Sequence, residues 1–138
     1  MSVLEETDLR VSLMKVTRRL RAEKSDTELT DSQMSVLAVL DRSGPLTPRA
    51  LADFERVQPP SMTRTLASLD ARGLVDREPD PADGRQIIVR ITPSGAAAVT
   101  ATRRQRDAWL ARRLADLDPE ERAVLARASQ ILRRIADS

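Results

Sequence analysis

A repeated helix-start motif constrains the fold of this chain more than any other feature of its sequence. Thr47-Pro48, Thr92-Pro93 and Asp118-Pro119 each place an oxygen-bearing side chain directly before a proline. That oxygen caps the free N–H groups of a helix, and proline fits the first helical position because its missing N–H would have no partner there. Thr30 and Gln33 have the spacing of a capping box, which marks one more helix start. These motifs predict a mainly helical fold.

Two stripes of apolar residues at helical spacing lie near the ends of the chain. They consist of Leu9, Leu13, Val16 and Leu20, and of Val124, Ala128, Ile131 and Ile135, which Leu125 and Leu132 widen. Between these stripes the start and stop signals predict helices over residues 31–41, 48–54 and 93–114. Gly44-Pro45 is expected to end the first of the three.

One more helix is predicted between Val57 and Gly73. A residue that precedes proline avoids the helical region, so Pro59 is expected to be the cap and Pro60 the first helical residue. Gly73 is expected to end this helix because glycine tolerates the left-handed conformation of a C-terminal cap.

After Gly73 the apolar residues change from a helical to a strand period. Residues 74–78 and 86–91 are predicted to be strands, and the Asp-Gly pair and two prolines between them predict a turn. A two-stranded hairpin alone is marginally stable, so it must pack against neighbouring helices. The expected fold class is therefore mainly α with a small β-hairpin.

The composition excludes most enzyme classes. The chain has no Cys and no His, which removes disulfides, thiol chemistry, imidazole bases and the commonest zinc ligand. No acid–base pair at a suggestive spacing replaces them. We therefore expect no catalytic activity, no metal and no cofactor.

Charge and hydropathy indicate where the protein acts. No apolar run approaches the ~20 residues that a transmembrane helix needs, and the acidic residues 1–10 have the wrong charge for a signal peptide. We expect a soluble, cytoplasmic protein without membrane contact. The net charge is only +2, and residues 47–92 carry seven basic and seven acidic groups. Any DNA contact must therefore come from the local placement of charge.

The order of elements is that of a helix-turn-helix motif followed by a wing. In such a motif the second helix enters the major groove of DNA. The short helix from Thr47 would brace, and the helix from Pro60 would read the DNA. At ~100° per residue, Arg64 is the centre of the outer face, opposite an inner face formed by Met62, Leu66 and Leu69.

The outer face has residue types that suit DNA recognition. Pro60, Ala67 and Ala71 lie beside Arg64, and Ser61, Thr63 and Ser68 flank it. Arg64 can contact O6 and N7 of guanine, and Ser61 and Thr63, near the helix start, suit phosphate. The alternative is an ordinary solvated face, which would usually carry Glu or Asp as well. Arg49 of the bracing helix is a further candidate for DNA contact.

The predicted hairpin tip adds one more cation. A guanidinium on a narrow projection can enter a minor groove, and Arg85 is expected there. Asp83 is expected to form the turn and to orient Arg85 through an ion pair. Taken alone, Asp-Gly-Arg is a common turn.

A larger set of residues carries a resemblance to a known family. It comprises Leu29-Thr30, Gln33, Leu37, Leu51-Ala52, residues 69–75, Arg77, Asp80-Pro81, residues 83–85, Val89, Ile91-Thr92 and Gly95. With these residues the chain resembles, essentially end to end, the MarR family of bacterial winged-helix transcriptional regulators. The resemblance implies that Asp83 and Arg85 are the wing pair and that residues 61–68 cover the reading face. One departure is Gly84, where many relatives have a second basic residue.

The terminal helices predict a second copy of the chain as a partner. Their apolar side chains are too many for solvent, although packing within one chain would explain part of them. They are Trp109, Leu110, Leu114, Val124, Leu125, Ile131, Leu132 and Ile135. The resemblance also implies a dimer through the terminal helices that binds a pseudo-palindromic operator.

The family resemblance further implies a small effector, often phenolic or carboxylate-bearing, between the dimerisation helices and the winged part. Met14, Arg18 and Trp109 are the candidate lining residues, and core packing or surface charge is the alternative interpretation of them. Met34 and Met62 are expected to pack in the core rather than to act as oxidation sensors.

These observations define the domain and function hypotheses. Residues 1–138 are expected to form a single MarR-like domain, with a winged helix-turn-helix over 30–92 and dimerisation helices over 1–25 and 93–138. The leading hypothesis is a sequence-specific regulator that binds double-stranded DNA, in particular a repressor released by a small molecule. The near-neutral segment 47–92 motivates an alternative, a winged-helix module that serves protein–protein assembly without sequence-specific DNA binding.

Overall fold

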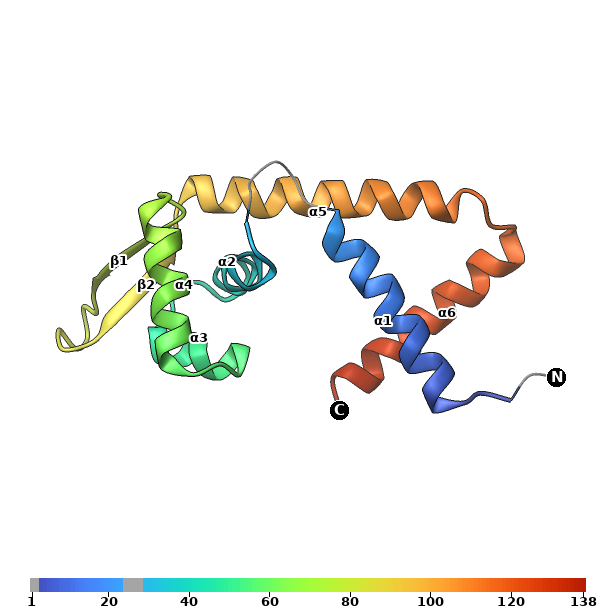
Figure 1. The fold of residues 1–138 in the computed structure, drawn as a ribbon, viewed down its shortest axis with the longest axis horizontal. Helices are drawn as coiled ribbons and strands as arrows, with labels where there is room; N and C mark the ends of the chain where they lie inside the picture. The colour runs from blue at the N-terminus through green and yellow to red at the C-terminus, as the bar shows by residue number, and fades with distance from the viewer. Residues whose placement is uncertain (1–2, 24–28) are drawn as a thin grey trace. The chain divides into compact units, whose positions relative to one another are not determined.

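The computed structural model describes residues 3–23 and 29–138 and is mainly helical with one β-hairpin (Figure 1). The elements in chain order are α1 (Glu6–Ala22), α2 (Asp31–Ser43), α3 (Pro48–Glu55), α4 (Pro59–Ala71), β1 (Val75–Pro79), β2 (Ile87–Ile91), α5 (Pro93–Leu114) and α6 (Pro119–Ala136). The predicted fold class is therefore confirmed.

The chain forms two compact units. One comprises residues 24–104, and the other comprises residues 1–23 and 105–138. Helix α5 contributes its first half to the former unit and its second half to the latter. The functional division into residues 30–92 and flanking dimerisation helices stays a prediction.

Local cap chemistry forms the starts of α2 and α6 as predicted. Thr30 accepts a hydrogen bond from the Gln33 backbone N–H at 3.1 Å, and the Gln33 side chain accepts one from the Thr30 N–H at 3.0 Å. Asp118 and Glu121 form the same capping box at the start of α6. At the opposite ends of α2 and α4, Gly44 and Gly73 have φ of 85° and 71°, which only glycine adopts readily.

The start of α4 differs from the prediction by one residue. Gln58 is the N-cap, with φ −72° and ψ 147°, and both Pro59 and Pro60 are helical. The expectation that Pro59 is the cap was wrong because the first N–H groups of a helix have no intrahelical acceptor, so two successive prolines lose no hydrogen bond there. The extended backbone of Gln58 satisfies the constraint that precedes a proline. Both strands also begin one residue later than predicted.

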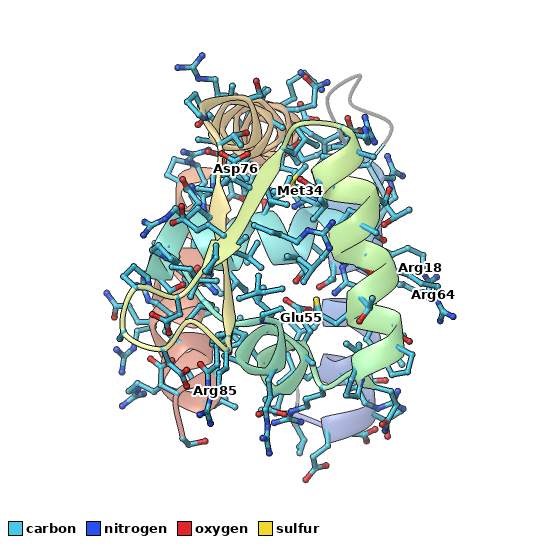
Figure 2. The ribbon with its side chains drawn as sticks, turned by 90° about the vertical axis from the view of Figure 1, so that its left-hand side faces the viewer. Arg18, Met34, Glu55, Arg64, Asp76 and Arg85 are labelled. Carbon is cyan, nitrogen blue, oxygen red and sulfur yellow. The ribbon has the colours of Figure 1, made fainter. Side chains whose placement is uncertain are left out.

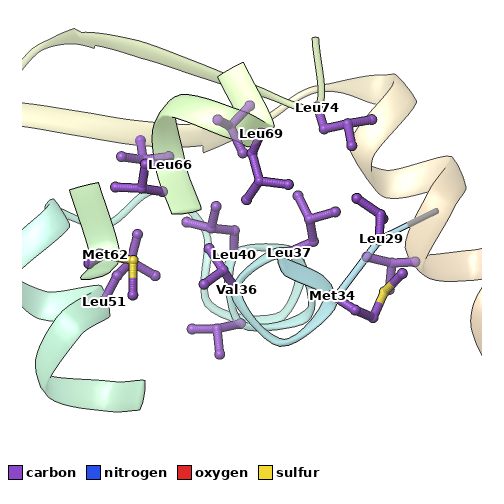
Figure 3. Close-up of a cluster of buried hydrophobic side chains, with 14 of the residues drawn as sticks. Leu29, Met34, Val36, Leu37, Leu40, Leu51, Met62, Leu66, Leu69 and Leu74 are labelled. Atoms are coloured by element: carbon purple, nitrogen blue, oxygen red, sulfur yellow. The ribbon is translucent and has the colours of Figure 1, made fainter. Parts of the chain in front are cut away.

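The core of the unit formed by residues 24–104 consists mainly of aliphatic side chains from α2, α3, α4, the hairpin and the first half of α5 (Figure 3). Leu37, Leu51 and Leu69 are fully buried, and Met34 and Met62 pack in the same cluster as expected. The hairpin also pairs with the loop before α3, since Leu46 and Val89 exchange backbone hydrogen bonds of 3.2 and 2.8 Å. The hairpin is thus held by its neighbours, as its small size requires.

Gln33 connects the cap of α2 to α4. Its Nε2 donates a 2.9 Å hydrogen bond to the hydroxyl of Ser68, while its Oε1 accepts from Thr30. We expect Gln33→Ala to lower the free energy of unfolding by about 1–2 kcal/mol, because both bonds are lost. Chemical denaturation measures this change. Ser68→Ala, which loses only the bond between helices, should cost less, and equal effects of the two variants would contradict the account.

In the unit formed by residues 1–23 and 105–138, Trp109 contacts two arginines. The guanidinium carbons of Arg19 and Arg113 lie 5.4 and 5.3 Å from the centroid of the Trp109 ring, within the range of cation–π attraction. Arg106 Nε donates a 3.1 Å hydrogen bond to the carbonyl of Leu20 near the end of α1. These contacts attach α1 to the second half of α5.

Helices α1 and α6 leave much of their apolar surface exposed. Neither helix has a buried residue within the described ranges. The exposed apolar side chains are Val11, Leu13, Met14 and Val16 on α1 and Val124, Leu125, Ile131 and Ile135 on α6. Trp109, in contrast, is 8% exposed, so packing within one chain explains only part of the predicted apolar set.

Candidate DNA-binding surface

Helix α4 separates an apolar inner face from an exposed outer face. Met62, Leu66 and Leu69 are at most 2% exposed and pack against α2 and α3. Arg64 is exposed, and its side chain extends away from the helix on the outer side (Figure 2). The predicted orientation of the helix is therefore confirmed, with Arg64 at the surface.

Most hydroxyl groups near Arg64 already form intramolecular hydrogen bonds. Thr63 Oγ1 donates to the Pro59 carbonyl at 3.0 Å, and Ser61 Oγ accepts from Arg64 Nη2 at 3.4 Å. Ser68 accepts from Gln33 and is half-buried. The structure thus brings Ser61 to Arg64, whereas Ser68 connects α4 to α2.

The first turn of α4 offers few free backbone donors. Pro59 and Pro60 have no N–H, and the N–H groups of Ser61 and Met62 donate to the Gln58 carbonyl at 3.0 and 3.2 Å. The predicted phosphate binding near the helix start therefore cannot use the backbone N–H groups of this turn. Phosphate contacts at this end must come from side chains.

Two aspartates shape the hairpin tip, which is the wing. Asp83 Oδ1 accepts a 3.1 Å hydrogen bond from the backbone N–H of Arg85, and Asp80 Oδ1 accepts one of 2.9 Å from Ala82. Asp83 is therefore a turn former, as expected. The expected ion pair is absent from the described structure, because the carboxylate of Asp83 binds the backbone of Arg85 rather than its guanidinium.

Ion pairs occupy some arginines of this unit and leave others available. Arg77 binds Asp70 at 2.8 Å, and Arg90 binds Glu78 across the hairpin. Among the described residues, Arg49, Arg56, Arg64 and Arg85 form no ion pair. These four arginines, from α3, the turn, α4 and the wing, supply the uncommitted positive charge of the surface.

Arg49 lies near α4. It lines, together with Asp53, Thr63 and apolar neighbours, a surface pocket of about 510 Å³ between α3 and α4. The structure therefore places Arg49 and Thr63, which are predicted DNA contacts from different helices, around the same pocket.

The sequence interpretation did not identify two exposed residues of the turn as candidates for DNA contact. Arg56 ends α3 in the left-handed conformation, with φ 55°, and Gln58 precedes α4 with a side chain that does not cap the helix. Their position between the two helices of the motif was the available signal, because that turn must lie near any DNA that α4 contacts.

The candidate effector residues do not form one cluster in the described contacts. Met14 and Arg18 are exposed on α1, and Met14 Sδ accepts a 3.8 Å hydrogen bond from Arg10. Trp109 contacts Arg19 and Arg113 instead, and its Nε1 is buried without an acceptor in the described part of the chain. The sequence interpretation missed both arginines because a helical stripe does not fix side-chain rotamers.

The structure thus has a bracing helix, an exposed reading helix and a hairpin, which define a winged helix-turn-helix protein. A model of the MarR family matches residues 27–86. An HTH-type transcriptional regulator of Mycobacterium tuberculosis (strain CDC 1551 / Oshkosh) is 46% identical over 131 residues, which cover 95% of this chain and 92% of that protein. The chain belongs to the MarR family and is a DNA-binding transcriptional regulator.

Two further comparisons agree with this assignment. The HTH-type transcriptional repressor NicR of Pseudomonas putida is 33% identical over 93 residues, which cover 67% of this chain and 59% of that protein. The crystal structure of a transcriptional regulator from Pseudomonas aeruginosa superposes with a TM-score of 0.86 at 35% identity, covering 96% of this chain and 93% of the other. No helix in the described ranges has the length and apolar character that crossing a membrane requires.

Proposed function

We propose that this protein is a homodimeric, cytoplasmic repressor that binds a pseudo-palindromic operator through α4 and the wing of each protomer. The observation that carries the proposal is the outer face of α4, which exposes Arg64 and carries no unpaired carboxylate, since Asp70 binds Arg77. A solvated helix face without a DNA partner would usually carry acidic residues as well. The repressor role is supported by the likeness to NicR.

The proposed contacts follow the geometry of the uncommitted side chains. Arg64 would bind guanine in the major groove, and Arg85 would enter the minor groove from a tip shaped by Asp83. Arg49 and Ser61 would bind phosphates, and Thr63 would do so by turning its hydroxyl away from the Pro59 carbonyl. Ser68 would hold α4 in position through Gln33. The DNA-binding part would comprise residues 30–92.

The dimer would form through the terminal helices, residues 1–25 and 93–138. The exposed apolar side chains of α1 and α6 support this assignment, because burial of each would contribute ~1.5–3 kcal/mol. A two-fold dimer presents two reading helices to half-sites about one helical turn apart.

A small aromatic or carboxylate effector would release the repressor from DNA. Met14, Arg18 and Trp109 remain the proposed lining residues. An anionic ligand is supported by two observations. The buried Nε1–H of Trp109 has no acceptor among the described residues, and Arg19 and Arg113 lie beside the ring. The chain has one Trp and no Tyr, so intrinsic fluorescence reports on this environment alone.

The salt dependence of binding tests the proposed function. The probe is duplex DNA from upstream of the protein's own gene, and fluorescence anisotropy measures its Kd at several salt concentrations. A regulator that neutralises phosphates releases counterions, so affinity should fall about a thousandfold between 50 and 200 mM salt. Undetectable binding, or affinity that hardly changes with salt, would favour the alternative of a protein–protein assembly module.

Gly84 offers a gain-of-function prediction. A Cβ at this position would meet no atom within 4 Å, and the residue is not in the left-handed region. We expect Gly84→Arg to tighten DNA binding about tenfold. The slope of log K against log salt concentration should become steeper by about two, because each of the two wings adds one phosphate contact. Gly84→Gln changes the backbone in the same way without charge and should leave the salt slope unchanged. An unchanged slope for the Arg variant would contradict the placement of the wing on DNA.

A further inference from the structure

The outer face of α4 is dominated by apolar side chains around Arg64. At about 100° per residue, five side chains lie within about 60° of the direction of Arg64, and three of them are apolar, namely Pro60, Ala67 and Ala71. The other two are Ser61 and Ser68. Pro60, Ala67 and Ala71 are all exposed. None of these three side chains can donate or accept a hydrogen bond.

The polar side chains next to this strip are largely committed. The hydroxyl proton of Thr63 is donated to Pro59, and Thr63 lies about 100° from Arg64 around the helix. Ser61 and Ser68 are half-buried, where Ser61 accepts from Arg64 and Ser68 accepts from Gln33. Asp70 binds Arg77. Within α4, Arg64 is therefore the one exposed side chain with free donors directed away from the helix.

These properties restrict which base edges α4 can read. An arginine pairs with O6 and N7 of guanine, whereas adenine is read by Asn or Gln and cytosine by a free carboxylate. No Asn or Gln occurs within α4, and its single carboxylate is engaged. Small apolar side chains such as alanine contact one base feature in the major groove, the C5-methyl group of thymine.

We infer that each operator half-site contains one guanine, read by Arg64, and adjacent thymines whose C5-methyl groups contact the apolar strip formed by Pro60, Ala67 and Ala71. This inference rests on the proposed function and specifies the DNA that the same surface prefers. Specificity then comes from one bidentate hydrogen-bonded pair and from methyl contacts, with no Asn, Gln or free carboxylate on α4 to read adenine or cytosine.

The test begins with the full-length protein and random duplex DNA. Selection should enrich a two-fold-symmetric site with a guanine in each half and thymines next to it. Each of these thymines is then replaced by deoxyuridine, which removes only the C5-methyl group. Loss of one methyl contact should raise Kd about fourfold, while the same replacement at distant thymines should leave Kd unchanged.

A variant cycle assigns the methyl contact to the helix. In Ala67→Gly the ratio of Kd for the deoxyuridine site to Kd for the thymine site should fall from about four to about one at one thymine position. The reason is that the Cβ that contacts the methyl group is gone. Ala97→Gly changes an exposed alanine of α5 by the same group and should retain the full penalty. Circular dichroism confirms that both variants remain helical.

The outcomes separate the inference from the function on which it rests. If no site is enriched, the proposed function itself fails. If a site is enriched but deoxyuridine has no effect, or if its adjacent positions are adenines whose recognition depends on Gln58, DNA binding stands and the inference about methyl contacts is overturned.

Discussion

Replacing Arg64 with alanine is expected to weaken operator binding at least about thirtyfold while leaving the fold intact. Arg64 is exposed, and its one intramolecular partner is the hydroxyl of Ser61. Its removal should cost about 1–3 kcal/mol in each half-site, and a dimer loses two such contacts. Fluorescence anisotropy at fixed salt measures the loss, and thermal unfolding checks that stability is unchanged.

Two control variants separate base reading from general charge. Arg64→Lys keeps the cation but loses the planar fork, so it should recover only the salt-dependent part of the affinity. Arg42→Ala removes an exposed cation from α2, outside the proposed surface, and should leave binding unchanged. Wild-type affinity in Arg64→Ala would remove the basis of the proposed DNA contact.

Replacing Gly95 with alanine is expected to lower the free energy of unfolding by about 3 kcal/mol. A Cβ at Gly95 would lie 2.2 Å from the carbonyl oxygen of Leu74 and 2.8 Å from Cγ1 of Ile91. Backbone cannot move away as a flexible side chain can, so overpacking here is costly although alanine favours helix. Chemical denaturation of Gly95→Ala measures the change. Gly84→Ala, whose Cβ meets nothing within 4 Å, is the matched control and should cost little.

The reason for this close approach is the junction at which α5 begins. Thr92 donates from Oγ1 to the Gly73 carbonyl at 2.7 Å and accepts at the same oxygen from the Gly95 N–H at 3.1 Å. Its own N–H donates to the Leu74 carbonyl at 3.1 Å. One threonine thus fixes the start of α5 against the end of α4, and a shift at Gly95 should also misplace the reading helix. Wild-type stability in Gly95→Ala would contradict this packing.

The parts of the fold that depend on neighbouring residues could be predicted from the sequence. The capping boxes at Thr30 and Asp118 and the inner face of α4 follow from contacts three or four positions apart, which a sequence displays directly. The one-residue error at Pro59 arose because the constraint before a proline is a bias, and the missing N–H groups were free to lie at two successive positions.

The parts of the site that depend on distant residues or on rotamers could not be predicted from the sequence. The bond from Gln33 to Ser68 joins residues 35 positions apart, and nothing local in the sequence indicates that this serine binds α2. Asp83 was correctly placed in the turn, but the choice between the backbone and the guanidinium of Arg85 is a matter of side-chain geometry. The same limit led to Arg18 in place of its neighbour Arg19 as a residue near Trp109.

Chemical protection of guanine tests most directly whether α4 lies in the major groove with Arg64 on a guanine. Dimethyl sulfate methylates guanine N7, which is exposed in that groove, so protection at saturating protein reports the contact directly. We expect the wild type to protect one guanine in each half-site. Arg64→Ala, at saturation, should leave that guanine reactive while protection elsewhere is retained. Identical protection patterns for the two proteins would show that Arg64 does not contact the base and would overturn the proposed role of α4.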